Sequence, residues 1–93
     1  MRVISGSARG LKLLSLDGLD TRPTLDRVKE ALFSIIQFDI PNAKVLDLFG
    51  GTGQLGIEAL SRGAKSAVFV DEAESACSLI KENLRRTKLG QAA

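Results

Sequence analysis

Two aspartates and a run of glycines have the types and spacing of a ligand-binding site. Asp47 stands near the end of an apolar stretch, and the glycines follow it in Phe49-Gly-Gly-Thr-Gly-Gln-Leu-Gly56. Asp71 ends the next apolar stretch. Glycines let a backbone approach a ligand closely, and a carboxylate can accept hydrogen bonds from ribose hydroxyls. This combination predicts a site for a cofactor that contains adenosine.

The position of Asp47 favours S-adenosylmethionine over a dinucleotide. Residues 51–56 match the pattern G-x-G-x-x-G, and Asp71 lies at the distance that the dinucleotide fingerprint requires. A carboxylate beside this loop would, however, repel a pyrophosphate bound at the helix N-terminus. S-adenosylmethionine has no phosphate and carries an ammonium group, which Asp47 could bind. The alternative without any ligand is a plain turn between a strand and a helix.

Four elements would position these residues. The apolar runs predict strands at Lys44–Leu48 and Ser66–Val70, and helices over Gln54–Ser61 and about 73–87. Gly63 is placed to be the left-handed residue after the first of these helices. This order predicts an α/β fold class, the front half of a Rossmann-like parallel sheet flanked by helices. Parallel sheets rarely stop at two strands, so we expect the sequence to be part of a larger domain.

The first twenty residues form a different kind of segment. Arg2–Ser5 and Leu11–Leu16 read as two strands of a β-hairpin joined by Gly6–Gly10, and a turn follows at Asp17-Gly18 and Asp20. We therefore divide the chain into a basic β-hairpin extension, residues 1–20, and a partial cofactor-binding α/β domain, residues 21–93.

A helix is predicted from Thr24 to about Gln37, with Thr24 as its cap and Pro23 just outside it. Apolar side chains recur on one stripe of this helix and have to be buried against something. A second copy of the chain is the simplest partner, so we expect self-association. Three phenylalanines are expected in the core, whereas Phe49 could equally line a cofactor pocket. The stripe consists of Val28, Ala31, Leu32, Ile35 and Ile36, and the core phenylalanines are Phe33, Phe38 and Phe69.

Composition excludes several classes of protein. The 93 residues suffice for one small domain, with a net charge of +2. The absence of histidine excludes zinc sites built on that residue, and the single cysteine, Cys77, excludes an internal disulfide. No signal peptide or membrane-spanning run is visible, so we expect a cytoplasmic protein without metal or membrane. Residues 1–16 carry Arg2, Arg9 and Lys12 but no acid, which suits either phosphate contacts or a solvated surface.

Three segments together resemble the RsmD-type methyltransferases, bacterial enzymes that methylate the exocyclic N2 of a guanine in 16S ribosomal RNA. The glycine motif alone would indicate only a class I methyltransferase, whereas the first two segments make the resemblance specific. The segments are Arg2-Val-Ile-Ser-Gly-Ser-Ala-Arg-Gly-Leu-Lys-Leu13, Thr21-Arg-Pro-Thr-Leu-Asp-Arg-Val-Lys-Glu-Ala-Leu-Phe33 and Val45-Leu-Asp-Leu-Phe-Gly-Gly-Thr-Gly-Gln-Leu-Gly-Ile-Glu-Ala-Leu-Ser-Arg-Gly-Ala64.

The resemblance implies a role for each matching residue. The methionine end of S-adenosylmethionine would be held by Asp47, Gly51 and Gly53, and its ribose by Asp71. The methionine carboxylate and the mouth of the active site would be bordered by Thr21, Arg22 and Thr24. The hairpin with Arg2, Arg9 and Lys12 would engage ribosomal RNA or a small-subunit particle, and a flipped guanine would meet the methyl group.

The sequence departs from the family at the catalytic motif, which is Asn or Asp, then two prolines, then an aromatic residue. The only prolines here are Pro23 and Pro41, so the motif is absent. We therefore expect the cofactor-binding portion alone, without a catalytic residue. Two other functions stay open: a non-catalytic nucleic-acid-binding module, and a fragment of an NAD-dependent oxidoreductase.

Overall fold

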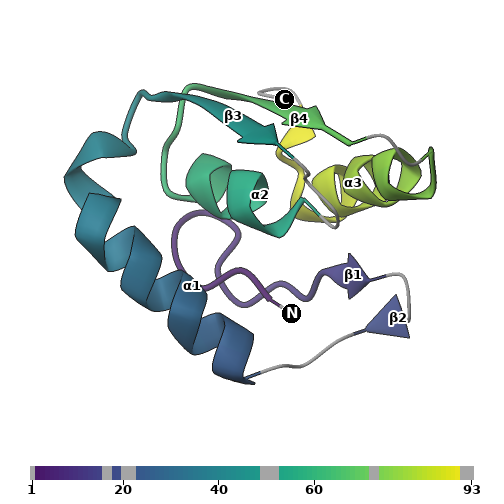
Figure 1. Cartoon of the computed structure of the whole chain (residues 1–93), viewed down its shortest axis with the longest axis horizontal. Coiled ribbons are helices and arrows are strands. Elements are labelled where there is room, and N and C mark those ends of the chain that lie inside the picture. Colours follow the sequence, from purple (N-terminus) through teal and green to yellow (C-terminus); the bar gives the residue numbers. More distant parts are fainter. Residues whose placement is uncertain (1, 16–17, 20–22, 49–52, 72–73, 91–93) are drawn as a thin grey trace.

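The structure, a computed structural model, describes residues 2–15, 18–19, 23–48, 53–71 and 74–90. A two-stranded parallel sheet lies over two helices, and a third helix and the N-terminal segment complete the molecule (Figure 1). In chain order the elements are β1 (Leu14–Ser15), β2 (Gly18–Leu19), α1 (Pro23–Ile36), a 3-10 turn (Gln37–Asp39), β3 (Lys44–Leu48), α2 (Gln54–Ser61), β4 (Ser66–Val70) and α3 (Glu74–Thr87).

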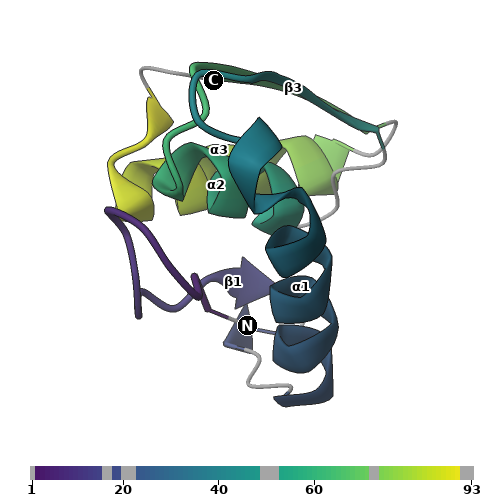
Figure 2. The same ribbon diagram turned by 90° about the vertical axis from the view of Figure 1, so that its left-hand side faces the viewer.

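The parallel sheet and its helices confirm the predicted strand–helix–strand–helix unit. Strands β3 and β4 pair in parallel from Lys44 opposite Ser66 to Leu48 opposite Val70. Helix α2 connects the two strands, and α2 and α3 lie on the same side of the sheet in both views (Figures 1 and 2). The bounds of β3, α2 and β4 are the predicted ones, and Gly63 has the expected left-handed conformation at φ 103°.

The N-terminal hairpin has fewer residues in β-strand than the sequence predicted. Arg2 and Lys12 form an antiparallel bridge, supported by hydrogen bonds between Val3 and residues 10 and 11. Leu14–Ser15 instead pairs with Gly18–Leu19 in a second small ladder. The predicted strands over Arg2–Ser5 and Leu11–Leu16 are therefore wrong in extent. The physical reason is that backbone N–H groups of residues 4, 5, 7 and 8 donate to helix α2 and not across the hairpin.

Helix α1 begins at Pro23, one residue before the prediction. Proline suits this position because its missing N–H would have no partner inside the helix. The predicted apolar stripe is largely uncovered within the chain: Val28, Leu32 and Ile35 are exposed, Ile35 at 80%, whereas Ile36 packs against the core. Burial of the stripe against a second copy of the chain stays a prediction. The helix instead buries Lys29 and Phe33, because Lys29 reaches the buried carboxylate of Glu58 on α2.

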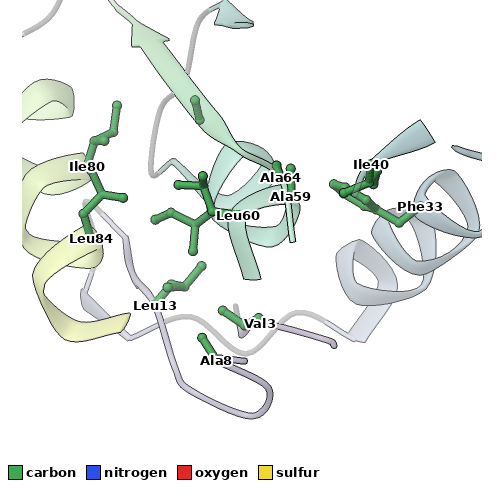
Figure 3. Close-up of a cluster of buried hydrophobic side chains, with 12 residues drawn as sticks. Val3, Ala8, Leu13, Phe33, Ile40, Ala59, Leu60, Ala64, Ile80 and Leu84 are labelled. Carbon is green, nitrogen blue, oxygen red and sulfur yellow. The ribbon is translucent and has the colours of Figure 1, made fainter. Parts of the chain in front are cut away.

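The hydrophobic core lies between α2, α3, α1 and the N-terminal segment. Figure 3 shows Leu60 of α2 facing Leu13 and Val3 of the N-terminal segment, with Ile80 and Leu84 of α3 nearby. Phe33 belongs to this cluster and Phe69 packs against it, as predicted. Phe38 does not, because the 3-10 turn after α1 leaves it 90% exposed.

The opposite face of the sheet is uncovered. Leu46 of β3 and Val68 of β4 are partners in register, and both are exposed, Leu46 at 61%. Val70 is exposed as well. Parallel sheets are ordinarily buried on both faces, so this face has the composition of an interior surface. The division at residue 20 stays a prediction, although Val3, Ala8 and Leu13 share the core of the larger part.

Candidate functional site

The candidate site is the edge of the sheet at which both parallel strands end. Leu48 and Val70 are partners in register, so the chain leaves β3 and β4 at the same edge. Asp71 follows Val70 directly, and helix α2 begins at Gln54, after the glycine loop that follows β3. Ligands of open α/β sheets bind at this carboxyl edge. Of the predicted cofactor residues, Asp47, Gly53 and Asp71 are described here, whereas Phe49 and Gly51 lie outside the described residues.

Asp47 links the strand before the loop to the helix after it. Its side chain is 8% exposed, and its Oδ2 accepts a hydrogen bond from the backbone N–H of Gly56 at 3.2 Å. Burial raises the pKa of the Asp47 carboxyl, and the Gly56 N–H partly opposes this by stabilising the ionised form. Within the part of the chain that the structure describes, Oδ1 has no hydrogen-bond partner. Asp47 is thus fixed by one of its two carboxylate oxygens.

Two glycines of the motif have different structural roles. Gly53 caps α2 in the left-handed conformation, φ 81°, and a Cβ there would lie 3.2 Å from Ile57 and 3.3 Å from Ile80. Gly56 has no such strain, but a Cβ would overlap the ring of Phe69 on β4. Gly53 therefore permits the turn, and Gly56 permits close packing of the helix against the strand. At Gly53 and Gly56, the two described glycines of the motif, the structure therefore favours glycine.

Asp71 lies across the same edge and is half-buried. The thiol of Cys77 on α3 donates a hydrogen bond to the backbone carbonyl oxygen of Asp71, with a distance of 3.5 Å between the sulfur and the oxygen. This contact ties the residue after β4 to the helix that follows. Cys77 itself is half-buried on the face of α3 that also carries the buried Ala76, Ile80 and Leu84.

The segment between the hairpin and α1 is the least described part of the predicted site. Thr21 and Arg22 lie outside the described residues. Thr24 lies in the first turn of α1, one residue inside the helix, and its side chain is not among those described. The expected contact of these three residues with a methionine carboxylate stays a prediction.

The three bases of the hairpin are all exposed. Arg2 and Lys12 are direct partners in the antiparallel bridge, which places both side chains on one face, and Arg9 lies in the loop between them. Like charges directly opposite each other destabilise a ladder. Whether these bases bind an anionic partner or form a solvated surface stays a prediction.

Sequence reasoning missed a network of polar side chains that joins the hairpin to α2 and α3. The carboxylate of Glu58 and the hydroxyl of Ser61 on α2 bind the hairpin backbone. On α3, the buried amide of Asn83 accepts from the N–H of Leu14 at 2.7 Å and donates to its carbonyl oxygen at 3.0 Å. Polar residues on the inner faces of predicted helices were the available signal, since such positions are ordinarily apolar.

The described residues contain neither a metal-binding cluster nor a membrane-spanning helix. Among the described residues, no three His, Cys, Asp or Glu side chains are grouped so as to hold a metal ion. No helix in the described ranges has the length and apolar character needed to cross a membrane.

Comparison with known proteins agrees with this geometry. The family described as Conserved hypothetical protein 95 matches residues 1–93. The ribosomal RNA small subunit methyltransferase D of Haemophilus influenzae is 43% identical over 95% of this chain and 46% of its own length. YlbH of Bacillus subtilis is 48% identical over 96% of this chain and 48% of its own length.

A solved structure, that of yhhF from Escherichia coli, matches with a TM-score of 0.83 and 40% identity. It covers 97% of this chain, and the match covers 49% of that protein. The solved structure therefore shares the fold of this chain in about half of its length. The chain belongs to the RsmD-type methyltransferase family, and it spans about half the length of the relatives that it matches.

Proposed function

We propose that this chain is the cofactor-binding portion of an enzyme that methylates guanine N2 in small-subunit ribosomal RNA, with S-adenosylmethionine as the methyl donor. The observation that carries the proposal is the meeting of Asp47, the glycine-capped start of α2 and Asp71 at one sheet edge. The names of the relatives support ribosomal RNA as the substrate. The cytoplasm would be the place of action.

The described residues fit the chemistry of this cofactor. Asp47 is a nearly buried carboxylate with one oxygen held by the N–H of Gly56, so its second oxygen can meet the ammonium group. Gly53 allows the left-handed turn into α2, and Asp71, which follows β4 at the same sheet edge, would accept hydrogen bonds from the ribose hydroxyls. S-adenosylmethionine supplies, when bound, a methyl group on a sulfonium centre. A phosphate ligand would be repelled by Asp47, which argues against a dinucleotide.

The remaining roles follow the family resemblance. Gly51 would help to hold the methionine end of the cofactor, and Phe49, from its place in the loop, would line the pocket. Arg2, Arg9 and Lys12 would bind RNA phosphates and present the guanine. The chain would align the donor, and the residues that orient the target amine would come from a Pro-Pro motif that this sequence lacks. We therefore expect no methyl transfer by the 93 residues alone, measured with labelled donor and small-subunit particles.

Calorimetric titration with S-adenosylhomocysteine and, separately, with NAD tests the cofactor assignment. S-adenosylhomocysteine should bind and NAD should not. Asp71→Ala should weaken binding by about 1.5–3 kcal/mol, the scale for losing hydrogen bonds to a charged group. Binding of NAD alone would favour an oxidoreductase, and binding of RNA without either ligand would favour a non-catalytic module. A folded Asp71→Ala variant that binds as tightly as the parent would remove the ribose role.

A further inference from the structure

Glu58 is a buried carboxylate that receives four donors. Its side chain is 0% exposed. Oε1 accepts from the backbone N–H of Ile4 at 2.8 Å and lies 3.5 Å from Nζ of Lys29. Oε2 accepts from the backbone N–H of Ser5 at 3.0 Å and from Nε of Arg62 at 2.8 Å. The carboxylate of this helix residue therefore joins the hairpin, α1 and the end of α2.

Neighbouring contacts hold the same stretch of hairpin. The buried hydroxyl of Ser61 accepts from the N–H of Ala8 at 2.9 Å and donates to the carbonyl oxygen of Ser5 at 2.6 Å. The carbonyl oxygen of Ser61 accepts from the N–H of Ser7 at 2.8 Å. Lys29 donates to the carbonyl oxygen of Arg2 at 2.6 Å. The hairpin backbone from residue 2 to residue 8 is thus fixed to α2 and α1.

A buried ion network is a costly way to stabilise a fold. Well-packed apolar residues in place of a buried ion pair are often neutral or stabilising, whereas charges with directional hydrogen bonds can fix a unique geometry. Here the geometry that is fixed belongs to the segment carrying Arg2, Arg9 and Lys12. Helix α2 carries the candidate cofactor loop at its N-terminus and this carboxylate one turn further on.

We propose that Glu58 is a positioning residue, which holds the basic hairpin at a fixed distance and orientation from the cofactor loop so that RNA bound by the hairpin meets the methyl donor in one register. The proposal rests on the proposed function, because it takes the hairpin's partner to be RNA. Lys29, Arg62 and Ser61 support Glu58 in this role. Undocking of the hairpin lowers RNA affinity in proportion to the docked fraction.

The variant Glu58→Gln tests the proposal, because it keeps the side-chain volume but cannot accept all four donors. Its matched control is Glu82→Gln on the outer face of α3, where Glu82 pairs with Arg85. Both variants raise the net charge by one, and added positive charge strengthens binding to phosphates. A loss of RNA affinity in Glu58→Gln therefore opposes the electrostatic change and reports the position of the hairpin.

Three measurements are made on the full 93-residue chain: amide hydrogen exchange, binding of a labelled stem-loop of small-subunit ribosomal RNA at fixed salt, and titration with S-adenosylhomocysteine. In Glu58→Gln, exchange at Ile4 and Ser5 should accelerate at least about tenfold, and RNA affinity should fall on the order of tenfold. Affinity for S-adenosylhomocysteine should stay within about twofold of the parent. Ser61→Ala, which leaves the charges intact, should change the same measurements in the same directions but less.

The outcomes separate this proposal from the proposed function. RNA binding by Glu58→Gln equal to that of Glu82→Gln, in a parent that binds RNA, overturns the positioning role alone. Parallel loss of RNA and S-adenosylhomocysteine binding in both Glu58→Gln and Ser61→Ala also overturns it, because that pattern reports a general structural role. A parent chain that binds no RNA refutes the RNA arm of the proposed function together with this inference.

Discussion

Replacing Gly6 by alanine should undock the hairpin from helix α2, and Gly10→Ala provides the matched control. Both glycines are left-handed, with φ 91° and 84°, so each alanine costs about 1–2 kcal/mol for the backbone conformation. A Cβ at Gly10 meets nothing within 4 Å, whereas a Cβ at Gly6 overlaps the backbone carbonyl of Ser61. The two substitutions therefore differ by the close approach to α2 and by little else.

The magnitude follows from the contacts that the overlap breaks. Moving residue 6 away from α2 breaks the Ser7 N–H bond to the Ser61 carbonyl and the two bonds of the Ser61 hydroxyl. At about 1 kcal/mol each, these bonds add about 3 kcal/mol to the backbone cost. We expect Gly6→Ala to lower the free energy of unfolding by about 4–5 kcal/mol and Gly10→Ala by about 1–2 kcal/mol.

Urea unfolding followed by circular dichroism measures both free energies. If the loss caused by Gly6→Ala is larger than the free energy of unfolding of the parent chain, amide hydrogen exchange at Ala8 provides a local measurement. Equal losses for the two variants, with Ala8 equally protected in both, would refute the docking of the hairpin on α2.

Three further predictions test the candidate site and the uncovered surface. Gly56→Ala should destabilise the fold by about 1 kcal/mol, since overpacking against Phe69 outweighs the helix-propensity gain; adding Phe69→Leu should restore stability in urea, and an additive loss would contradict the close packing. Burial raises the pKa of the Asp47 carboxyl, so the free energy of unfolding of the parent should rise as pH falls through that pKa. Asp47→Asn should remove this pH dependence and stabilise the fold at pH 7. The same variant should weaken S-adenosylhomocysteine binding at least about tenfold by calorimetry. The exposed apolar surfaces of α1 and the sheet should drive concentration-dependent self-association, which Ile35→Lys should reduce in sedimentation experiments; a monomer at all concentrations would contradict this.

The local pattern of the sequence was sufficient to predict the α/β unit. Strands β3 and β4 are short apolar runs, and Gly63 marks the end of α2, so their bounds followed from signals within a few residues. The candidate site followed as well, because parallel strands necessarily end at one edge and the motif places Asp47 and Asp71 there.

Predictions that depended on tertiary contacts were less accurate. Helical periodicity identified the apolar stripe through Val28, Leu32 and Ile35 but not the face of α1 that packs inward, which carries Lys29 bound to Glu58. Pairing within the hairpin was overestimated, since its N–H groups donate to Glu58 and Ser61, more than fifty residues away in sequence. A single sequence gives no signal for such distant partners, apart from the unusual presence of polar residues on an inner face.

Amide-resolved nuclear magnetic resonance during titration with S-adenosylhomocysteine can locate the cofactor site. We predict that the largest shifts fall at Asp47, Gly53 and Asp71, at the carboxyl edge of β3 and β4, while Ile4 and Ser5 at the hairpin change little. Binding with its largest shifts at the hairpin or on the exposed sheet face, or no binding at millimolar ligand, would contradict the assignment of this edge as the cofactor site.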